Sequence, residues 1–187
     1  MTKTSFKHFC EALDTVHPHK RVSDEYDENF DIARDENDRP IGITARKLTH
    51  QFKDPHSGDT INVIHDIKHK TDDYNPDPKK AKRTRIEVAF TRSPGEGSSE
   101  KTFRRVHAGK AALSIFGTVG AITKKVVDKY GHGETIVSAE AENNRVPAYS
   151  RMIKRHIGTE PDVTEYPDNH PGAGNSNLSF VIPKKDQ

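Results

Sequence analysis

The sequence predicts a mixed α/β (α+β) fold, in which a mostly antiparallel sheet is flanked by helices. Short runs of alternating apolar and polar residues, typical of half-buried strands, occur at 41–46, 61–67 and 86–90. A long amphipathic helix is expected at 113–130, and a further strand and helix follow it. Strands joined by turns, with helices only between the later strands, are typical of a mixed sheet.

Composition limits the class of protein. The chain has 187 residues, of which 31% are hydrophobic and 31% charged, so we expect a small core and long polar surface connections. Lys and Arg number 30 against 28 Asp and Glu, and this near balance makes a nucleic-acid partner unlikely. The single cysteine, Cys10, excludes an internal disulfide and fits a reducing compartment. No apolar run reaches the roughly 18 residues of a membrane span. We therefore expect a soluble, intracellular protein without a membrane partner.

The N-terminal part is expected to contain one helix and a polar arm. Apolar residues recur at helical spacing in 5–16, and Pro18 ends the pattern. The polar segment 18–40 is interpreted as a surface connection. The chain is thus divided into an N-terminal helix and arm, residues 1–30, and a main domain, residues 31–187.

Turn signals delimit the predicted strands. The run Asp54-Pro55-His56-Ser57-Gly58-Asp59 separates the strand at 41–46 from the strand at 61–67. Polar loops are expected at 72–78 and 93–99, and 102–106 is read as a resumed strand. These breaks predict hairpin connections in the first half of the chain.

A helix–strand–helix unit is predicted in the second half. Ile115, Val119, Ile122 and Val126 form one stripe of the first helix, and a Gly-His-Gly turn follows at 131–133. The strand at 135–141 leads into acidic residues. A basic helix then spans about 144–156, with Pro147 tolerated in its first turn. A long polar loop, 158–177, and a closing strand, 178–182, complete the pattern.

This layout resembles the fold of GNAT-like acyl-CoA N-acyltransferases, and more closely a group of poorly characterised tailed-phage proteins. A phage origin would imply a location in the host cytoplasm or in the virion. The N-terminal segment also resembles phage leaders that are cleaved after a Glu, here Glu11; a first helix that packs on the domain is the alternative. The residues that carry the main resemblance are Gly109, Phe116, Thr118, Val119, Ile122, Glu142, Arg145, Tyr149, Arg151, Lys154 and Arg155.

The resemblance implies transfer of an acyl group from acetyl-CoA, or another acyl-CoA, to an amine on a small molecule or a protein. It implies that Tyr149 is the general acid, and that Glu140 or Glu142 accepts a proton directly or through water. It also implies that the cofactor pyrophosphate lies on backbone N–H groups at the start of the long helix. The residues expected to bind the cofactor are His107, Ala108, Gly109, Lys110, Ala111, Ala112 and Arg145.

A catalytically inactive protein with the same fold is the competing hypothesis. The segment 104–110 departs from the usual phosphate-loop pattern of the family, and Tyr149 lies on an apolar helix face where it can simply be part of the core. Such a protein would act as a virion component or bind a phage or host protein. The basic runs at 79–85 and 145–156 are read as solvated faces, with anion or nucleic-acid binding as the alternative. No metal site is expected, because the His pairs lack further ligands at suitable spacing.

Overall fold

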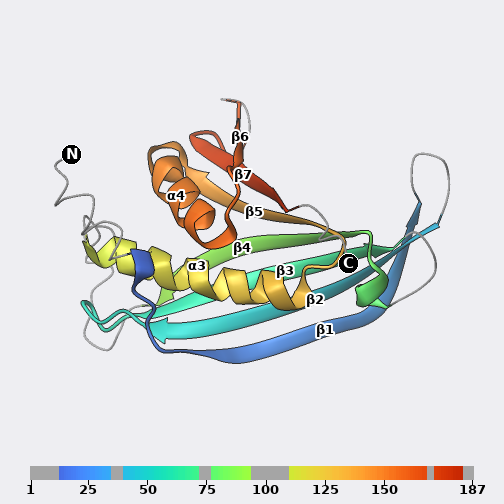
Figure 1. Cartoon of the computed structure of the whole chain (residues 1–187), viewed down its shortest axis with the longest axis horizontal. Helices are drawn as coiled ribbons and strands as arrows, with labels where there is room; N and C mark the ends of the chain where they lie inside the picture. The colour runs from blue at the N-terminus through green and yellow to red at the C-terminus, as the bar shows by residue number, and fades with distance from the viewer. Residues whose placement is uncertain (1–12, 35–39, 72–76, 94–109, 168–170, 183–187) are drawn as a thin grey trace.

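The computed structural model describes residues 13–34, 40–71, 77–93, 110–167 and 171–182 (Figure 1). This part contains a seven-stranded sheet in the order β1-β2-β3-β4-β5-β7-β6. Two helices, α3 and α4, and two short 3-10 turns accompany it. The bounds are β1 His19–Arg34, β2 Pro40–Lys53, β3 Thr60–Thr71, η1 Pro78–Lys80, β4 Arg83–Ser93, α3 Lys110–Tyr130, β5 Glu134–Glu142, η2 Asn143–Arg145, α4 Val146–Ile157, β6 Asp162–Glu165 and β7 Asn175–Ile182. None of the described helices is long and apolar enough to cross a membrane.

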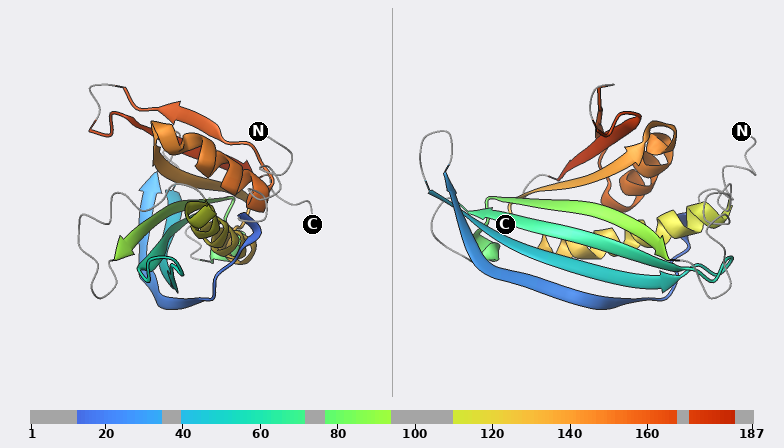
Figure 2. Two further views of the ribbon diagram at one scale, coloured as in Figure 1. Left: turned by 90° about the vertical axis from the view of Figure 1, so that its left-hand side faces the viewer. Right: turned by 180° about the vertical axis from the view of Figure 1, so that it is seen from behind.

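The sheet consists of two antiparallel halves joined by one parallel pair of strands. Strands β1 to β4 form the first half, and β5, β7 and β6 form the second. The parallel pair, β4 and β5, extends only from Arg83↔Glu134 to Val88↔Ala139. Beyond these residues β4 stays with β3 and β5 stays with β7, so the two halves diverge (Figure 2).

The main core lies between α3 and one face of the first half-sheet (Figure 1). Alternate residues of β3 are buried, starting with Ile61, because successive side chains of a strand point to opposite faces. The stripe of α3 that meets them is buried along its length and comprises Ile115, Val119, Ile122 and Val126. Helix α4 packs against α3, β5 and β7, and buries Tyr149, Met152 and Ile153.

The predicted fold class is confirmed, since the sheet is mixed and mostly antiparallel and helices flank it. The predicted strands at 41–46, 61–67 and 86–90 lie within β2, β3 and β4. The turn between β2 and β3 is also confirmed: the backbone N–H of Gly58 donates to the Asp54 carbonyl over 2.8 Å, and Gly58 has a φ of 75°.

The helix–strand–helix unit is confirmed as α3, β5 and α4. Pro147 lies at the start of α4, where its missing N–H has no helical acceptor in any case. Helix α4 ends at Gly158, which adopts the left-handed conformation with a φ of 88°.

Two expectations about polar segments are wrong. Residues 18–40 are not merely a surface connection, because β1 occupies His19–Arg34 and pairs with β2. Asp, Glu and Asn disfavour strands in general, but charged side chains suit an edge strand, where they discourage pairing with other chains. Strand β1 crosses residue 30, where the arm was predicted to end. Likewise, the predicted loop 158–177 contains the short edge strand β6 and the start of β7.

The predicted helix 5–16 lies mostly outside the described residues, and so does the predicted strand 102–106. Within the described part, Leu13 and Asp14 are helical. The segment that follows lies along α3: the backbone N–H of His17 donates to Thr118 Oγ1 over 3.0 Å. A Cβ on Gly117 would come within 2.3 Å of the Leu13 carbonyl oxygen, so this approach requires glycine on α3.

Candidate active site at the opening between β4 and β5

The divergence of β4 and β5 interrupts the ladder of backbone hydrogen bonds in the middle of the sheet, and the point where their pairing ends is named the opening. After Val88 and Ala139 the two strands no longer pair with each other. Alternate residues of 89–93 and 140–142 therefore direct backbone N–H and C=O groups toward the opening instead of toward a neighbouring strand. Exposed strand edges of this kind bind ligands that carry amide groups.

Three aromatic side chains from three elements meet beside this opening. The rings of Phe90 on β4 and Tyr149 on α4 are stacked, with centroids 5.8 Å apart. Phe116 on α3 packs edge-on against both, at 5.0 Å from Tyr149 and 5.9 Å from Phe90. This aromatic trio fixes the position of the Tyr149 ring relative to β4, because each ring contacts the other two.

Tyr149 is in an environment that keeps its hydroxyl protonated. Burial raises the pKa of Tyr149 to about 12; the positive charge of Arg145 opposes this rise and the negative charge of Glu142 adds to it. Within the described part of the chain, no hydrogen bond joins the Tyr149 hydroxyl to another residue. The phenol is therefore a donor without a competing acceptor over the whole physiological pH range.

The two candidate bases are placed differently. Glu142 and Arg145 form an ion pair with a distance of 3.0 Å between Oε2 and Nε, at the start of α4. Glu140 accepts a hydrogen bond of 2.6 Å from Asn175 Nδ2 on β7. Both carboxylates are exposed and lie on the face of β5 opposite to buried Ala139 and Ala141. The charges of Glu142 and Arg145 therefore act on Tyr149. Glu140 instead forms a hydrogen bond with Asn175 on β7.

The predicted phosphate cradle is only partly described. Helix α3 begins at Lys110, so Lys110, Ala111 and Ala112 form its first turn. His107, Ala108 and Gly109 lie outside the described residues. Phe116 is six residues beyond Lys110, which corresponds to about 9 Å along the helix axis. The first turn of α3 and Phe116 of the aromatic trio are therefore separated by less than two helical turns.

An acyl-CoA fits the chemistry of these groups. Its amide-bearing arm matches the unpaired strand edges, and its phosphates match the N–H groups at the start of a 21-residue helix. Arg145 precedes the first residue of α4, and its side chain is 61% exposed. Its guanidinium would bind an anionic group at the N-terminal end of α4.

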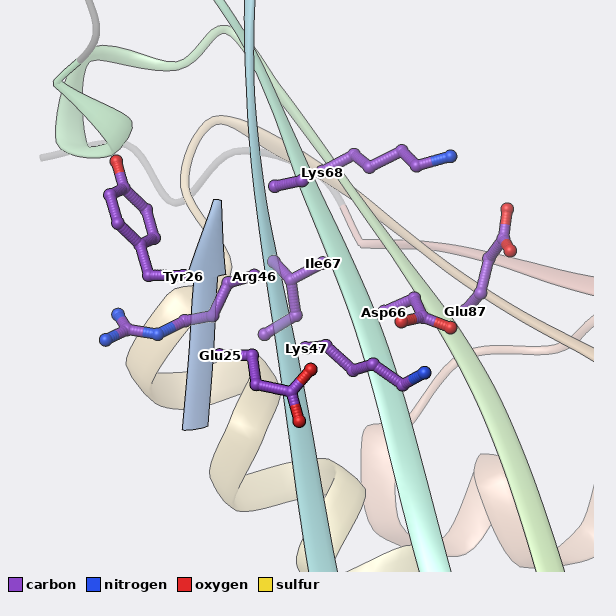
Figure 3. A pocket seen from close by; sticks show the side chains of 9 residues that line it. Glu25, Tyr26, Arg46, Lys47, Asp66, Ile67, Lys68 and Glu87 are labelled. Carbon is purple, nitrogen blue, oxygen red and sulfur yellow. The ribbon is translucent and has the colours of Figure 1, made fainter. Parts of the chain in front are cut away.

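A shallow surface groove lies elsewhere on the described part of the chain. It has a volume of about 420 Å³ and crosses β1 to β4 on the sheet face opposite to α3 (Figure 3). Glu25, Lys47, Asp66 and Glu87 stand in consecutive register across it. Such a row of mixed charges on an open sheet face is typical of a solvated surface, and it contains none of the predicted site residues.

The histidine pair at 65 and 69 belongs to the core. His65 Nε2 is 3.1 Å from Thr123 Oγ1 on α3, and His69 Nδ1 is 3.2 Å from Thr84 Oγ1 on β4. Burial lowers the pKa of His65 to about 3 and that of His69 to about 4, with neighbouring positive charges as the smaller cause. Among the described residues, no group of three or more His, Cys, Asp or Glu is arranged to hold a metal ion.

Comparison with known proteins gives distant structural similarities only. No protein-family profile matches the chain, and no curated protein matches its sequence. Rtt109 from Aspergillus fumigatus is 10% identical, with a TM-score of 0.34, over 87% of this chain and 45% of that protein. An acetyltransferase of the GNAT family from Bacillus anthracis is 13% identical, with a TM-score of 0.28, over 70% of this chain and 68% of that protein. The chain thus spans under half the length of Rtt109, and these loose superpositions assign no function.

In the second half of the chain, the observed order of helix, strand and helix agrees with the predicted order. A four-stranded antiparallel unit is followed by α3, then by β5 parallel to β4, and then by α4 with Tyr149 on its buried face. Sequence reasoning missed the contribution of Phe90 to the site. Its alternation with Ile86 and Val88 predicted only an inward orientation, and no local pattern indicates contact with Tyr149, which lies 59 positions further along the chain.

Proposed function

We propose that this protein is a GNAT-like N-acyltransferase that moves an acyl group from acetyl-CoA, or another acyl-CoA, to an amine. The observation that carries the proposal is the opening between the parallel strands β4 and β5, with the Tyr149 ring held beside it by Phe90 and Phe116. The cofactor would supply the thioester. The strand edges would orient its amide-bearing arm, and the first turn of α3 would bind its phosphates.

Tyr149 would act by donating its phenolic hydrogen to the sulfur that leaves. A phenol with a pKa of about 12 remains protonated, so it is available as a donor at every working pH. Complete transfer of this proton to a thiolate with a pKa of about 8.5 is uphill by about 3.5 pKa units. The expected role is therefore a strong hydrogen bond to the developing thiolate, which would take its proton from water as CoA leaves, while the proton of the amine would pass to Glu142.

Glu142 is the candidate base that we favour. Its charge raises the pKa of Tyr149 and it pairs with Arg145, whereas Glu140 is bound to Asn175 on β7. As base, Glu142 would accept the proton of the attacking amine directly or through one water, and Arg145 would then be released to an anionic part of the cofactor. The acceptor amine, on a small molecule or on a protein, is set by residues that surround the opening.

Steady-state kinetics with Tyr149→Phe test this proposal. We expect kcat to fall by about a hundredfold or more, because a positioned acid typically contributes that much, while the Kd for acetyl-CoA stays within about twofold. Tyr26→Phe, on the distant edge strand, is the matched control and should leave both values unchanged. Equal turnover by wild type and Tyr149→Phe would exclude the role assigned to Tyr149.

A second candidate function follows from the same aromatic trio. Aromatic rings that contact one another stabilise the fold whether or not the protein is catalytic. Tyr149 is 9% exposed, as expected of a tyrosine that is part of the core. In that case the protein would use the fold as a component of a phage virion or to bind a host protein. Detection of the chain by mass spectrometry of purified virions, together with no binding of acetyl-CoA, would favour this second function.

A further inference from the structure

A small basic hollow lies between the edge of the sheet and the C-terminal half of α3. It has a volume of about 300 Å³. Leu48, Val126 and the Tyr130 ring form its apolar part, and no acidic side chain of the described residues lines it. Its basic groups come from three elements and are His19, Arg21, His50, Lys125 and Lys129.

The hollow is separate from the proposed acyl-transfer site. Lys125 and Phe116 are nine residues apart on α3, which corresponds to about 14 Å and two and a half helical turns. They therefore project from opposite sides of the helix. The hollow opens toward β1 and β2, whereas the aromatic trio lies beside the opening between β4 and β5.

Positive charge in the hollow is only partly compensated. Asp24, whose charge acts on His50, is shared by two guanidinium groups: it accepts from Arg21 and from Arg46, both over 2.7 Å. Within the described part of the chain, neither Lys125 nor Lys129 forms an ion pair with a carboxylate. Lys129 Nζ instead lies 4.9 Å from the centre of the Tyr130 ring.

The basic runs that are continuous in the sequence differ from this hollow. In the first run, Arg83 pairs with Glu134 over 2.7 Å and Arg85 pairs with Glu87 over 3.2 Å. In the second run, which covers the start and the length of α4, Arg145, Lys154 and Arg155 pair with the acids Glu142, Glu160 and Asp14. Folding thus neutralises much of both continuous runs, and leaves an excess of positive charge where three separate segments meet.

One ring nitrogen of His50 lacks a hydrogen-bond partner among the described residues, whereas both ring nitrogens of His19 are engaged. His19 Nδ1 is 3.1 Å from the His17 carbonyl, and its Nε2 is 3.3 Å from Lys125 Nζ. His50 Nδ1 is buried and has no hydrogen-bond partner. Burial lowers the pKa of His50, and the charges of His19, Arg21 and Lys125 lower it further while Asp24 opposes them. An anion between these groups would relieve their mutual repulsion.

We propose that this hollow binds a phosphate group, either as inorganic phosphate or as a small phosphate monoester whose body covers Leu48 and Val126. Lys125, Lys129 and Arg21 would donate to the phosphate oxygens, since charge-assisted hydrogen bonds from these groups are the usual means of phosphate recognition. The Tyr130 ring would form one wall, and its hydroxyl, 3.5 Å from Arg21, would hold the guanidinium in place.

Calorimetric titration with inorganic phosphate and with phenyl phosphate tests the proposal and distinguishes the two sources. Sub-millimolar binding of either is expected, and phenyl phosphate should bind more tightly if the monoester is the natural class. Lys125→Gln and Lys129→Gln should each weaken binding about tenfold, the loss typical of one hydrogen bond from a charged group. Both lysines are on the surface of α3, so the variants should fold normally.

Lys68→Gln is the matched control, because it removes the same charge from an exposed position on the opposite sheet face. It should change the Kd by less than about twofold. The proposal is overturned if neither ligand binds at about 10 mM, or if Lys68→Gln weakens binding as much as Lys125→Gln does. In the second case the effect is a general response to net charge. Changes in the NMR signals of the His50 ring on titration provide an independent readout of the same site.

Discussion

Lowering the pH should destabilise the protein through His65. This side chain is 0% exposed, and burial lowers its pKa from 6.5 to about 3. The unfolded state therefore binds a proton that the folded state does not bind at pH values between about 3 and 6.5. The contribution of His65 to stability is fully present above pH 6.5 and is lost as the pH falls through this window, with a slope of about 1.4 kcal/mol per pH unit. At pH 5 the loss is about 2 kcal/mol.

Urea unfolding followed by circular dichroism at about pH 7.5 and pH 5 measures this effect. His65→Gln retains a polar group near Thr123 but does not titrate. Its unfolding free energy should therefore depend on pH less than that of the wild type, by about 2 kcal/mol between the two pH values. Val163→Ala, a change at an exposed position without a titrating group, should retain the wild-type dependence. Parallel pH profiles of wild type and His65→Gln would refute the assignment.

Three further changes should lower the free energy of unfolding. Gly120→Ala would place a Cβ 2.2 Å from the His156 ring, and should cost about 1–3 kcal/mol by forcing α3 and α4 apart. Arg92→Leu removes the cation that pairs with two buried aspartates of the β2–β3 turn, and should cost about 3–5 kcal/mol in urea unfolding. Thr84→Val removes a hydroxyl that donates to the His132 carbonyl over 2.7 Å and accepts from its N–H over 3.0 Å, and should cost about 1–3 kcal/mol in thermal unfolding.

Controls for these changes come from exposed positions. Arg83→Leu breaks the surface ion pair with Glu134 and should cost less than about 1 kcal/mol. If Arg83→Leu lowers the free energy of unfolding as much as Arg92→Leu does, burial of an ion pair does not determine its contribution to stability. For Gly120→Ala, unchanged stability would mean that the His156 ring moves aside without cost.

The parts of the fold that were predicted correctly have strong local patterns. Helix α3 was evident because its apolar stripe repeats at helical spacing over about three turns, and β3 because its alternation is regular. Strand β1 was missed because its sequence is dominated by polar and charged residues. Strand β1 pairs with β2 through backbone hydrogen bonds at the edge of the sheet. This pairing does not require the alternation of apolar and polar residues by which strands are recognised in a sequence.

The candidate site could be predicted only in part, because its geometry depends on distant segments. The resemblance placed Tyr149 on the last helix and acids at the end of β5, which is where the structure has them. The opening itself results from a parallel pairing between strands more than 40 residues apart, and no local signal reports where that pairing ends. The basic hollow was missed for the same reason, since its charges come from β1, β2 and α3 and form no continuous run.

Isothermal titration of the purified protein with acetyl-CoA and with CoA tests the central claim most directly. If the opening between β4 and β5 is an acyl-CoA site, both ligands should bind with micromolar Kd, and Tyr149→Phe should retain this affinity, because the phenolic hydroxyl is proposed to act on the leaving sulfur and not on the bound cofactor. No binding at about 1 mM of either ligand would contradict the acyltransferase proposal, and would leave the fold as a scaffold for binding a virion or host protein.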